Sequence, residues 1–540
     1  MTYQPHQRPV FDYERVADQD AKEPAHRPVV IVGGGLVGLT MAIDLVVKGV
    51  PVVVLEKGET VSEGSRSICQ AKRTLEIWDR LGAGDPMVEK GITWNVGKVF
   101  HRDRLLYQFD LLPETGHKMP AFVNLQQYYV EEYLLDRLHA LGGAVRWQHA
   151  LEALERHDDH VRLTVATPDG PYGLTCDWLI ACDGARSHVR RQLGLEFQGE
   201  VFEDKFLITD VHMKPDFPSE RWFWFEPPFH DGQTALLHRQ ADDIWRIDLQ
   251  MGWDADVEAE KDPARVIPRI RQMLGDDVDF DIDWISLYVF QCRTLEDYVH
   301  GRVIFAGDSA HQVSPFGARG GNGGVQDVDN LAWKLKLILD GTAPVRLLES
   351  YTEERLFAAR ENILNSTRAT DFMTPKTGTS RTVRDTTLAM AEAHPFARAL
   401  VNPGRLSVPA HLTASALNTP DDDAFDGRLG PGSPATDAPV QVAGQEGWWL
   451  DQLGERFVAA VHEPPGDLPE EVETPAGPVS VIALGEGQPI ADPDRHLTNR
   501  YDLAPGTTYL FRPDQHVAAR WRAFDAAKID AAVKRACALD

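Results

Sequence analysis

The sequence has few cysteines, and none of them is spaced for a chemical role. Its 540 residues include five, at Cys69, Cys176, Cys182, Cys292 and Cys537, and no two form a C-x-x-C pair. This odd, scattered set argues against a disulfide framework, a dithiol redox pair and a zinc knot, so we expect no metal site. A reducing, cytoplasmic compartment is the simplest expectation.

Long apolar runs and basic runs are also missing. No apolar stretch approaches the roughly 20 residues that a membrane-spanning helix requires. The segment from Met1 to Arg27 lacks the basic start and apolar centre of a secretory signal, and we expect a flexible tail over 1–27. A net charge of -27 without a Lys/Arg cluster disfavours binding to nucleic acid or to an anionic membrane.

The remaining composition is that of an ordinary globular protein. Hydrophobic residues make up 43% of the chain and charged residues 25%, which is enough apolar material for a sizeable core. Because 540 residues exceed what one hydrophobic core can organise, we expect two or three domains.

A glycine-rich turn near the N-terminus is the strongest local signal. The apolar run 29–32 enters a turn with Gly33, Gly35 and Gly38, and a second apolar run ends at Glu56. In such a βαβ unit the first glycine allows the turn, the second lets N–H groups approach a pyrophosphate, and the third lets the helix pack closely. Glu56 would accept a ribose hydroxyl. The pattern predicts a dinucleotide site, and its alternative is a plain strand–helix connection.

Two predicted helices follow this unit. Arg66 stands just before an amphipathic helix over 70–81, and Gln127 stands at the start of a core-facing helix over 127–138. From spacing alone, Arg66 fits equally well as a partner of the adenosine side of a nucleotide or as a cap on surface carboxylates.

Two later apolar strands end in glycine and aspartate. The strand 178–182 runs into Asp183-Gly184, which on its own is typical of a β-turn before a helix. The strand 302–306 runs into Gly307-Asp308, and five glycines over 317–324 then open a long helix. So many glycines are unfavourable in a helix start unless the backbone approaches something flat or anionic, whose charge the exposed N–H groups would stabilise.

Residues 201–300 alternate like an antiparallel sheet with one aromatic face. Such a face could form the wall of a pocket for a planar, partly polar ligand, and the alternative is an ordinary half-buried core. The candidate substrate-binding residues are Trp222, Trp224, His238, Gln240, Arg246 and Gln250.

The three glycine stretches, in this order, resemble the class A flavoprotein aromatic hydroxylases, the family of para-hydroxybenzoate hydroxylase and phenol hydroxylase, over roughly 28–370. The resemblance implies an α/β fold with a Rossmann-like FAD-binding domain (28–200 and 295–400) and an inserted antiparallel-sheet substrate domain (201–294). Proline-rich turns over 403–434 mark a boundary, and residues 410–540 resemble the thioredoxin-like C-terminal α/β domain of the phenol hydroxylase branch. Without a cysteine pair, that domain would serve packing or homodimerisation.

The resemblance also implies an oxidoreductase that carries FAD and uses NADPH or NADH as a transient reductant. Such enzymes hydroxylate a phenolic or other activated aromatic substrate with O₂ through a flavin C4a-hydroperoxide. The implied cofactor residues are Gly33, Gly35, Gly38, Glu56, Lys57, Arg66, Gln127, Asp183, Gly184, Gly307, Asp308, Pro315, Gly320, Gly321 and Asn322. Pro315 would face the flavin ring as part of the catalytic loop, and the candidate bases by residue type are His238, Tyr288 and His311.

Two alternative functions remain at this point. The segment 222–227 comes close to the W-x-W-x-I-P signature of the flavin-dependent halogenases, although Glu226 departs from it and the lysine of that family has no counterpart near the glycine turn. The second alternative is a redox-inactive scaffold that binds FAD without turnover.

Overall fold

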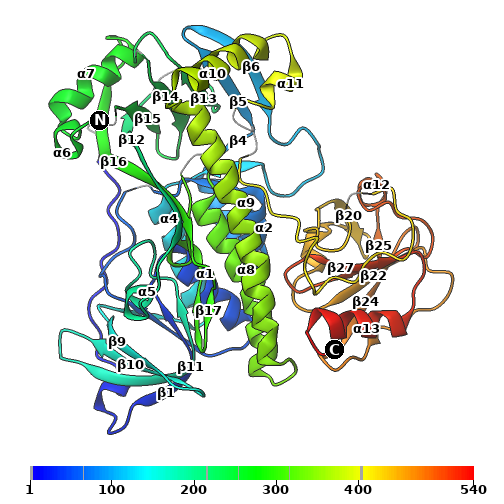
Figure 1. The fold of residues 1–540 in the computed structure, drawn as a ribbon. Helices are drawn as coiled ribbons and strands as arrows, with labels where there is room; N and C mark the ends of the chain where they lie inside the picture. The colour runs from blue at the N-terminus through cyan, green and yellow to red at the C-terminus, as the bar shows by residue number, and fades with distance from the viewer. Residues whose placement is uncertain are drawn as a thin grey trace.

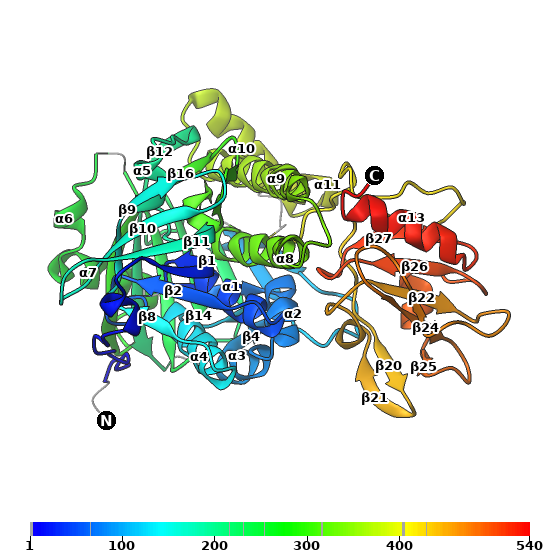
Figure 2. The same cartoon turned by 90° about the horizontal axis from the view of Figure 1, so that it is seen from below.

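The computed structural model describes residues 4–64, 66–214, 217–230, 232–252, 254–314, 317–401, 406–427 and 429–540. Two large sheets and the long helices between them form the body of the molecule, and a third sheet lies to one side (Figures 1 and 2). The expected α/β fold class is confirmed. Within the described residues, no helix combines the length and apolar character needed to cross a membrane.

The first sheet has the strand order β17-β18-β11-β1-β2-β8. Its parallel strands are β1 (Ala25–Val32), β2 (Val52–Glu56), β8 (Val145–Trp147), β11 (Tyr172–Ala181) and β18 (Val303–Phe305). The antiparallel strands are β17 (Val299–His300), β9 (Ala150–Arg156) and β10 (Val161–Ala166). Helices α1 (Leu36–Val47), α4 (Gln127–Ala140) and α8 (Gly320–Leu339) pack together beside this sheet.

The parallel arrangement brings the three glycine stretches together. Carboxyl ends of parallel strands meet at one edge of a sheet, where ligands of open α/β folds bind. Gly33 follows β1, Glu56 ends β2, Asp183 follows β11 and Gly307 follows β18. These four residues, distant in sequence, therefore lie along the same edge.

The N-terminal segment is docked rather than loose. The Phe11 N–H donates to the Glu59 carbonyl at 2.7 Å, and the Phe11 ring stacks on Trp147 with centroids 4.3 Å apart. Asp18 is buried in the 3-10 helix η1 (Ala17–Asp20) and accepts hydrogen bonds from Arg27 and Arg146. Sequence reasoning missed these contacts because the partners are far apart in sequence. Glu59 and Trp147 lie more than 40 residues from Phe11, and Arg146 lies 128 residues from Asp18.

The second sheet has the order β19-β16-β12-β15-β14-β13-β5-β6. Its strands are β5 (Val96–His101), β6 (Arg104–Asp110), β12 (Gln198–Met213), β13 (Arg221–Phe225), β14 (Thr234–Arg239), β15 (Ile244–Met251), β16 (Phe280–Thr294) and β19 (His311–Gln312). The sheet thus extends beyond the predicted 201–294, because β5 pairs in parallel with β13 and brings β6 with it.

Helices cover parts of both faces of this sheet. Helix α7 (Pro263–Leu274) packs on one face, while α9 (Glu349–Met373) and α10 (Gly378–Ala391) contribute to the core on the other. The remaining elements of the body are β3 (Cys69–Ala71), α2 (Lys72–Arg80), α3 (Gly84–Lys90), β4 (Ile92–Trp94), β7 (Phe122–Asn124), α5 (His188–Gln192), α6 (Val257–Glu260), η2 (Gly307–Ser309), η3 (Val345–Leu348) and α11 (Pro395–Arg398).

The C-terminal unit is built on the sheet β21-β20-β25-β24-β22-β26-β27, with β23 paired to β24. Its elements are β20 (Pro439–Val442), β21 (Gln445–Trp448), η4 (Leu450–Gln452), β22 (Val458–His462), β23 (Glu471–Val472), β24 (Val479–Leu484), β25 (Ile490–Ala491), α12 (His496–Arg500), β26 (Thr508–Phe511), β27 (Val517–Trp521) and α13 (Ala526–Ala536). This is a mixed sheet with a C-terminal helix. Its thioredoxin-like classification stays a prediction.

Candidate functional site

The first glycine turn leaves no room for side chains at two positions. Gly33 has a φ of +108°, and a Cβ there would lie 2.4 Å from the Cys182 carbonyl oxygen. A Cβ on Gly38 would lie 1.9 Å from the Gly33 carbonyl oxygen. Gly35, the extended residue before α1, has its nearest neighbour at 3.6 Å. The N-terminus of α1 is therefore held tightly against the turn, while its approach at Gly35 stays open to a phosphate.

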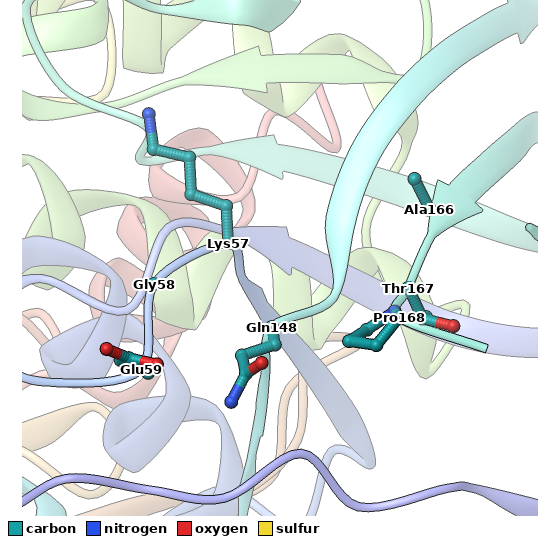
Figure 3. Close-up of a pocket in the computed structure, with 7 residues that line it drawn as sticks. All are labelled: Lys57, Gly58, Glu59, Gln148, Ala166, Thr167 and Pro168. Carbon is teal, nitrogen blue, oxygen red and sulfur yellow. The ribbon is translucent and has the colours of Figure 1, made fainter. Parts of the chain in front are cut away.

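Glu56 lies at the edge of this turn. Its carboxylate accepts the N–H groups of Gly34 and Gly58, each at 2.7 Å. The adjacent Lys57 is exposed and borders a surface hollow of about 490 Å³ between the end of β2 and the end of β10. Figure 3 shows the Lys57 side chain extending away from Gln148, which lies across that hollow.

The loop 61–68 is tied to helix α4. Gln127 accepts the Ser67 N–H at 3.1 Å and donates to Ser62 Oγ at 3.0 Å and to Glu131 Oε1 at 2.8 Å. Glu131 also accepts the Ser62 N–H at 2.7 Å, and burial raises the pKa of its carboxyl. Sequence reasoning found Gln127 and missed Glu131, which lies four residues further on the same helix face.

Arg66 lies near both the second sheet and the edge of the first sheet that carries Gly33, Glu56, Asp183 and Gly307, which we call the cofactor edge. Its side chain is exposed, and its positive charge acts to lower the pKa values of both Asp308 and Tyr288, although burial keeps each of them raised. The interaction with Asp308, an exposed carboxylate, is compatible with the second role considered from spacing, whereas Tyr288 belongs to neither role.

One carboxylate oxygen of Asp183 accepts backbone hydrogen bonds, and the other has no partner among the described residues. Its Oδ2 accepts the N–H groups of His188 at 2.6 Å and Val189 at 3.1 Å at the start of α5. Its Oδ1 is buried and has no hydrogen-bond partner among the described residues. Gly184 has a φ of +73° with open space around its Cβ position. A buried acceptor next to the glycine turn fits a ligand that brings a donor.

Asp308 opens onto the same edge. The residue is exposed, yet desolvation by the surrounding protein raises the pKa of its carboxyl against the charges of His311 and Arg66. A Cβ on Gly320 would lie 3.7 Å from Asp308 Oδ1. The Asp308 carboxylate therefore lies next to the first turn of α8, so one ligand could contact both.

Asp327 of helix α8 binds the backbone of the turn at Gly307. It accepts the Gly307 N–H at 2.9 Å, His311 Nε2 at 2.7 Å and Arg355 Nε at 2.7 Å. Burial opposes the ionised form, but His311 and Arg355 outweigh it and lower the pKa of Asp327. His311 is thus a structural partner of Asp327, which removes it from the candidate bases.

Protein contacts explain part of the glycine-rich start of α8. A Cβ on Gly321 would lie 2.5 Å from Ser67 Oγ, and one on Gly324 would lie 3.0 Å from the Gly307 Cα. The Asn322 side chain is fully used, because it accepts the Ala71 N–H and donates to the Cys69 and Ala318 carbonyls. Only backbone N–H groups remain for an anion at this helix start. Pro315 lies outside the described residues.

The second sheet separates the residues expected to form the substrate wall. Trp222 and Trp224 pack with Phe217 and Phe229 on the face covered by α7. Directly paired residues point to the same side of a sheet, and His238, Arg246, Asp210 and Trp284 are paired in one row on the other face. We call this the inner face. Assigning Trp222 and Trp224 to the same wall as His238 was wrong, because they lie at alternate positions of the pleat.

The inner face borders the cofactor edge. A Cβ on Gly64 would lie 2.4 Å from the Trp284 ring, and Cys69 Sγ lies 3.8 Å from His238 Nδ1. Arg246 is buried and donates to both oxygens of Asp210, at 2.8 and 2.9 Å. That pairing explains why Arg246 is not an open anchor for a substrate carboxylate.

Gln250 and Gln240 lie within the sheet, and the Gln250 side chain is bonded there. Gln250 accepts the N–H and Oγ of Thr234, each at 3.0 Å. Gln240 is buried at the β14–β15 turn, where its N–H donates to the Ile244 carbonyl. Sequence reasoning passed over Asp248, which lies between Arg246 and Gln250 on the inner face, two residues from each.

Residues 26–366 match the model of the FAD binding domain family. The chain is 32% identical over 356 residues to 12-dehydrotetracycline 5-monooxygenase/anhydrotetracycline 6-monooxygenase of Streptomyces rimosus, covering 63% of this chain and 68% of that protein. It is 30% identical over 337 residues to para-nitrophenol 4-monooxygenase of a Pseudomonas species, covering 61% and 82%.

Its fold is similar to that of aklavinone-11 hydroxylase in complex with FAD and aklavinone. The TM-score is 0.77 at 23% identity, with 96% of this chain and all of that chain covered. The strand-edge geometry, with an open glycine approach, an unused Asp183 oxygen and an exposed Asp308, fits FAD. The chain therefore belongs to the FAD binding domain family and is an FAD-dependent monooxygenase of the aromatic and polyketide hydroxylase group.

Proposed function

We propose that this protein uses NADH or NADPH and O₂ to hydroxylate a phenolic or other electron-rich aromatic ring. In the balanced reaction, NAD(P)H, a proton, O₂ and the arene give NAD(P)⁺, water and the hydroxylated product. FAD, when bound, supplies the hydride acceptor and the oxygen activation that amino-acid side chains lack.

The contact of the segment 61–69 with the inner face carries this proposal. A Cβ on Gly64 would lie 2.4 Å from the Trp284 ring, and Cys69 Sγ lies 3.8 Å from His238 Nδ1. Arg66, in the same segment, acts electrostatically on both Asp308 and Tyr288. A ligand lying against the inner face is therefore next to the place where Asp308 and the first turn of α8 would hold the flavin. This arrangement supports oxygen transfer between two ligands bound side by side.

Backbone groups of the chain would support the reaction. The N–H groups of Gly320, Gly321 and Asn322 belong to the first turn of α8, which has no intrahelical acceptors for them. They would stabilise negative charge on a bound cofactor without reorganising. The Trp284 ring packs on Gly64 and closes the loop 61–68 against the sheet, which helps to exclude water.

The test is an O₂-uptake screen of the FAD-loaded protein against phenols, hydroxylated aromatic acids and polycyclic phenols. We expect at least one compound to stimulate NAD(P)H oxidation and O₂ uptake and to yield a product one oxygen atom heavier. A strict halide requirement would indicate a halogenase instead. Absence of stimulated O₂ uptake with every compound would support a redox-inactive scaffold and overturn the proposal.

A further inference from the structure

Two neighbouring polar atoms on the inner face have no partner. Nε2 of His238 and Oδ1 of Asp248 are buried, and neither forms a hydrogen bond with any described residue. His238 pairs across the strands with Arg246, and Asp248 follows Arg246 by two residues. The two side chains are therefore diagonal neighbours on adjacent strands β14 and β15, within reach of one ligand.

The neighbours of His238 decide which nitrogen carries its proton. Trp94 Nε1 donates to Asn124 Oδ1 at 2.7 Å, which fixes the orientation of that amide. Asn124 Nδ2 then donates to the Arg239 carbonyl at 2.7 Å and to His238 Nδ1 at 3.4 Å. Nδ1 is therefore an acceptor, so the neutral ring carries its proton on Nε2.

His238 stays neutral across the working pH range. The side chain is 3% exposed, and burial, with the charges of Arg221 and Arg246, lowers its pKa well below the usual range. A neutral imidazole with its proton on Nε2 donates from that atom. His238 therefore presents a hydrogen-bond donor at Nε2 and cannot accept a proton at that atom.

Asp248 supplies the complementary acceptor. Arg246 gives Nε and one terminal nitrogen to Asp210, and Asp248 Oδ1 has no hydrogen-bond partner among the described residues. The direct cross-strand neighbours of Asp248 are Leu236 and Ile208, both apolar. Burial raises the pKa of Asp248 to about 6, opposed by Arg246 and Arg221, so the carboxyl is ionised at neutral pH. An ionised carboxylate accepts hydrogen bonds and does not donate them.

We propose that His238 and Asp248 together recognise a hydroxyaryl ketone, a phenolic ring that carries a carbonyl group, as the substrate class. His238 Nε2–H donates to the carbonyl oxygen, and Asp248 Oδ1 accepts the phenolic hydroxyl. The inference rests on the proposed function, since it names the substrate for the same site. A buried donor and acceptor that stay unpaired without the right ligand discriminate strongly against analogues lacking either group.

The test uses the FAD-loaded full-length protein and flavin absorbance changes as the readout of binding. The probes are the 2′-, 3′- and 4′-hydroxyacetophenones, because their geometry samples three spacings of hydroxyl and carbonyl. Matched controls are the methoxyacetophenones, which lack the hydroxyl donor, and the ethylphenols, which lack the carbonyl. We expect one hydroxyacetophenone to bind roughly ten-fold tighter than either matched control.

Two variants give a crossed pattern that a structural role would not produce. His238→Leu should abolish the preference over the ethylphenol and keep the preference over the methoxy compound. Asp248→Leu should do the reverse. Gln250→Leu is the matched control, because that side chain lies on the same strand face but is bonded to Thr234. It should preserve both preferences, and FAD content and melting temperature report folding in all three variants.

Equal binding of all probes by the parent protein would overturn the inference, as would loss of affinity for every probe alike in both variants. Such a result would show that water satisfies His238 and Asp248. The proposed function fails by a separate result, namely no stimulated O₂ uptake with any aromatic compound. Hydroxylation of simple phenols without the crossed pattern would therefore reject the inference alone.

Discussion

Arg512 of the C-terminal unit donates to both carboxylate oxygens of Glu354 on helix α9, at 2.6 and 3.1 Å. Both side chains are buried. Arg512 also bonds Asp514, while Lys334 of helix α8 donates to Glu354 at 2.9 Å. A buried ionic cluster thus attaches the C-terminal unit to the long helices, beside which it lies in Figure 1.

Arg512→Met should destabilise the protein by about 3–5 kcal/mol, because it leaves Glu354 and Asp514 buried without their main partner. The measurement is the free energy of unfolding from urea titration followed by fluorescence. Arg456→Met is the matched control, since Arg456 pairs with Glu471 on the surface. Exposed pairs contribute about 0–1 kcal/mol, so equal losses in the two variants would contradict the assignment.

Asp308→Ala should weaken FAD binding by about 1.5–3 kcal/mol, the contribution of a hydrogen bond to a charged group. The residue is exposed at the strand edge, and its Oδ1 lies beside the start of α8. The measurement is titration of apoprotein with FAD, followed by quenching of flavin fluorescence. Asp340→Ala, at the far end of α8 and paired with Lys336, should bind FAD like the parent. Unchanged affinity in Asp308→Ala would refute the placement.

Local patterns predicted the first glycine turn well. Gly33 has a positive φ, and Gly38 has no room for a Cβ, so both positions require glycine. Their spacing is therefore visible in a short stretch of sequence. The antiparallel strands predicted within 201–300, such as β14, were found for the same reason, since alternation is a local property. These features could be found without knowing the rest of the fold.

Nonlocal pairing decided what the sequence reasoning missed. The parallel pairing of β5 with β13 joins Gly97 to Arg221, and no local pattern encodes a partner so far along the chain. Strand register also put Trp222 on the face away from His238. The base role considered for His238 failed because Asn124, from another sheet, fixes its tautomer. A period-two count from Arg246 would have found Asp248.

Gly321→Val should uncouple NAD(P)H oxidation from product formation while FAD stays bound. A Cβ at Gly321 would lie 2.5 Å from Ser67 Oγ, and the Ser67 backbone is tied to Gln127. The helix start must therefore shift, which displaces its N–H groups and admits water beside the flavin.

The measurement for Gly321→Val is the ratio of hydroxylated product to NAD(P)H consumed, with H₂O₂ assayed alongside. Gly378→Val, near the start of α10 with nothing within 4 Å of its Cβ position, is the matched control. A ratio equal to that of the parent would show that this helix start does not border the reacting ring.

The kcat/KM of the enzyme should fall at acid pH because Asp248 becomes protonated; we call this fall the acid limb of the pH profile. Its pKa is raised to about 6 by burial, so lowering the pH below about 6 protonates it and removes the acceptor for the substrate hydroxyl. The titratable or charged groups near Asp248 on the inner face include Asp210, Arg221, His238, Arg246 and Tyr288.

None of these other groups produces the same limb. Asp210 is locked to Arg246, the pKa of His238 lies well below the usual range, and that of Tyr288 lies above it. We expect kcat/KM to fall about ten-fold per pH unit below the limb and to stay level above it up to about pH 8. In Asp248→Asn the limb should vanish and leave a low, flat profile. A parent profile level down to pH 5, or a limb retained in the variant, would assign the proton to another group.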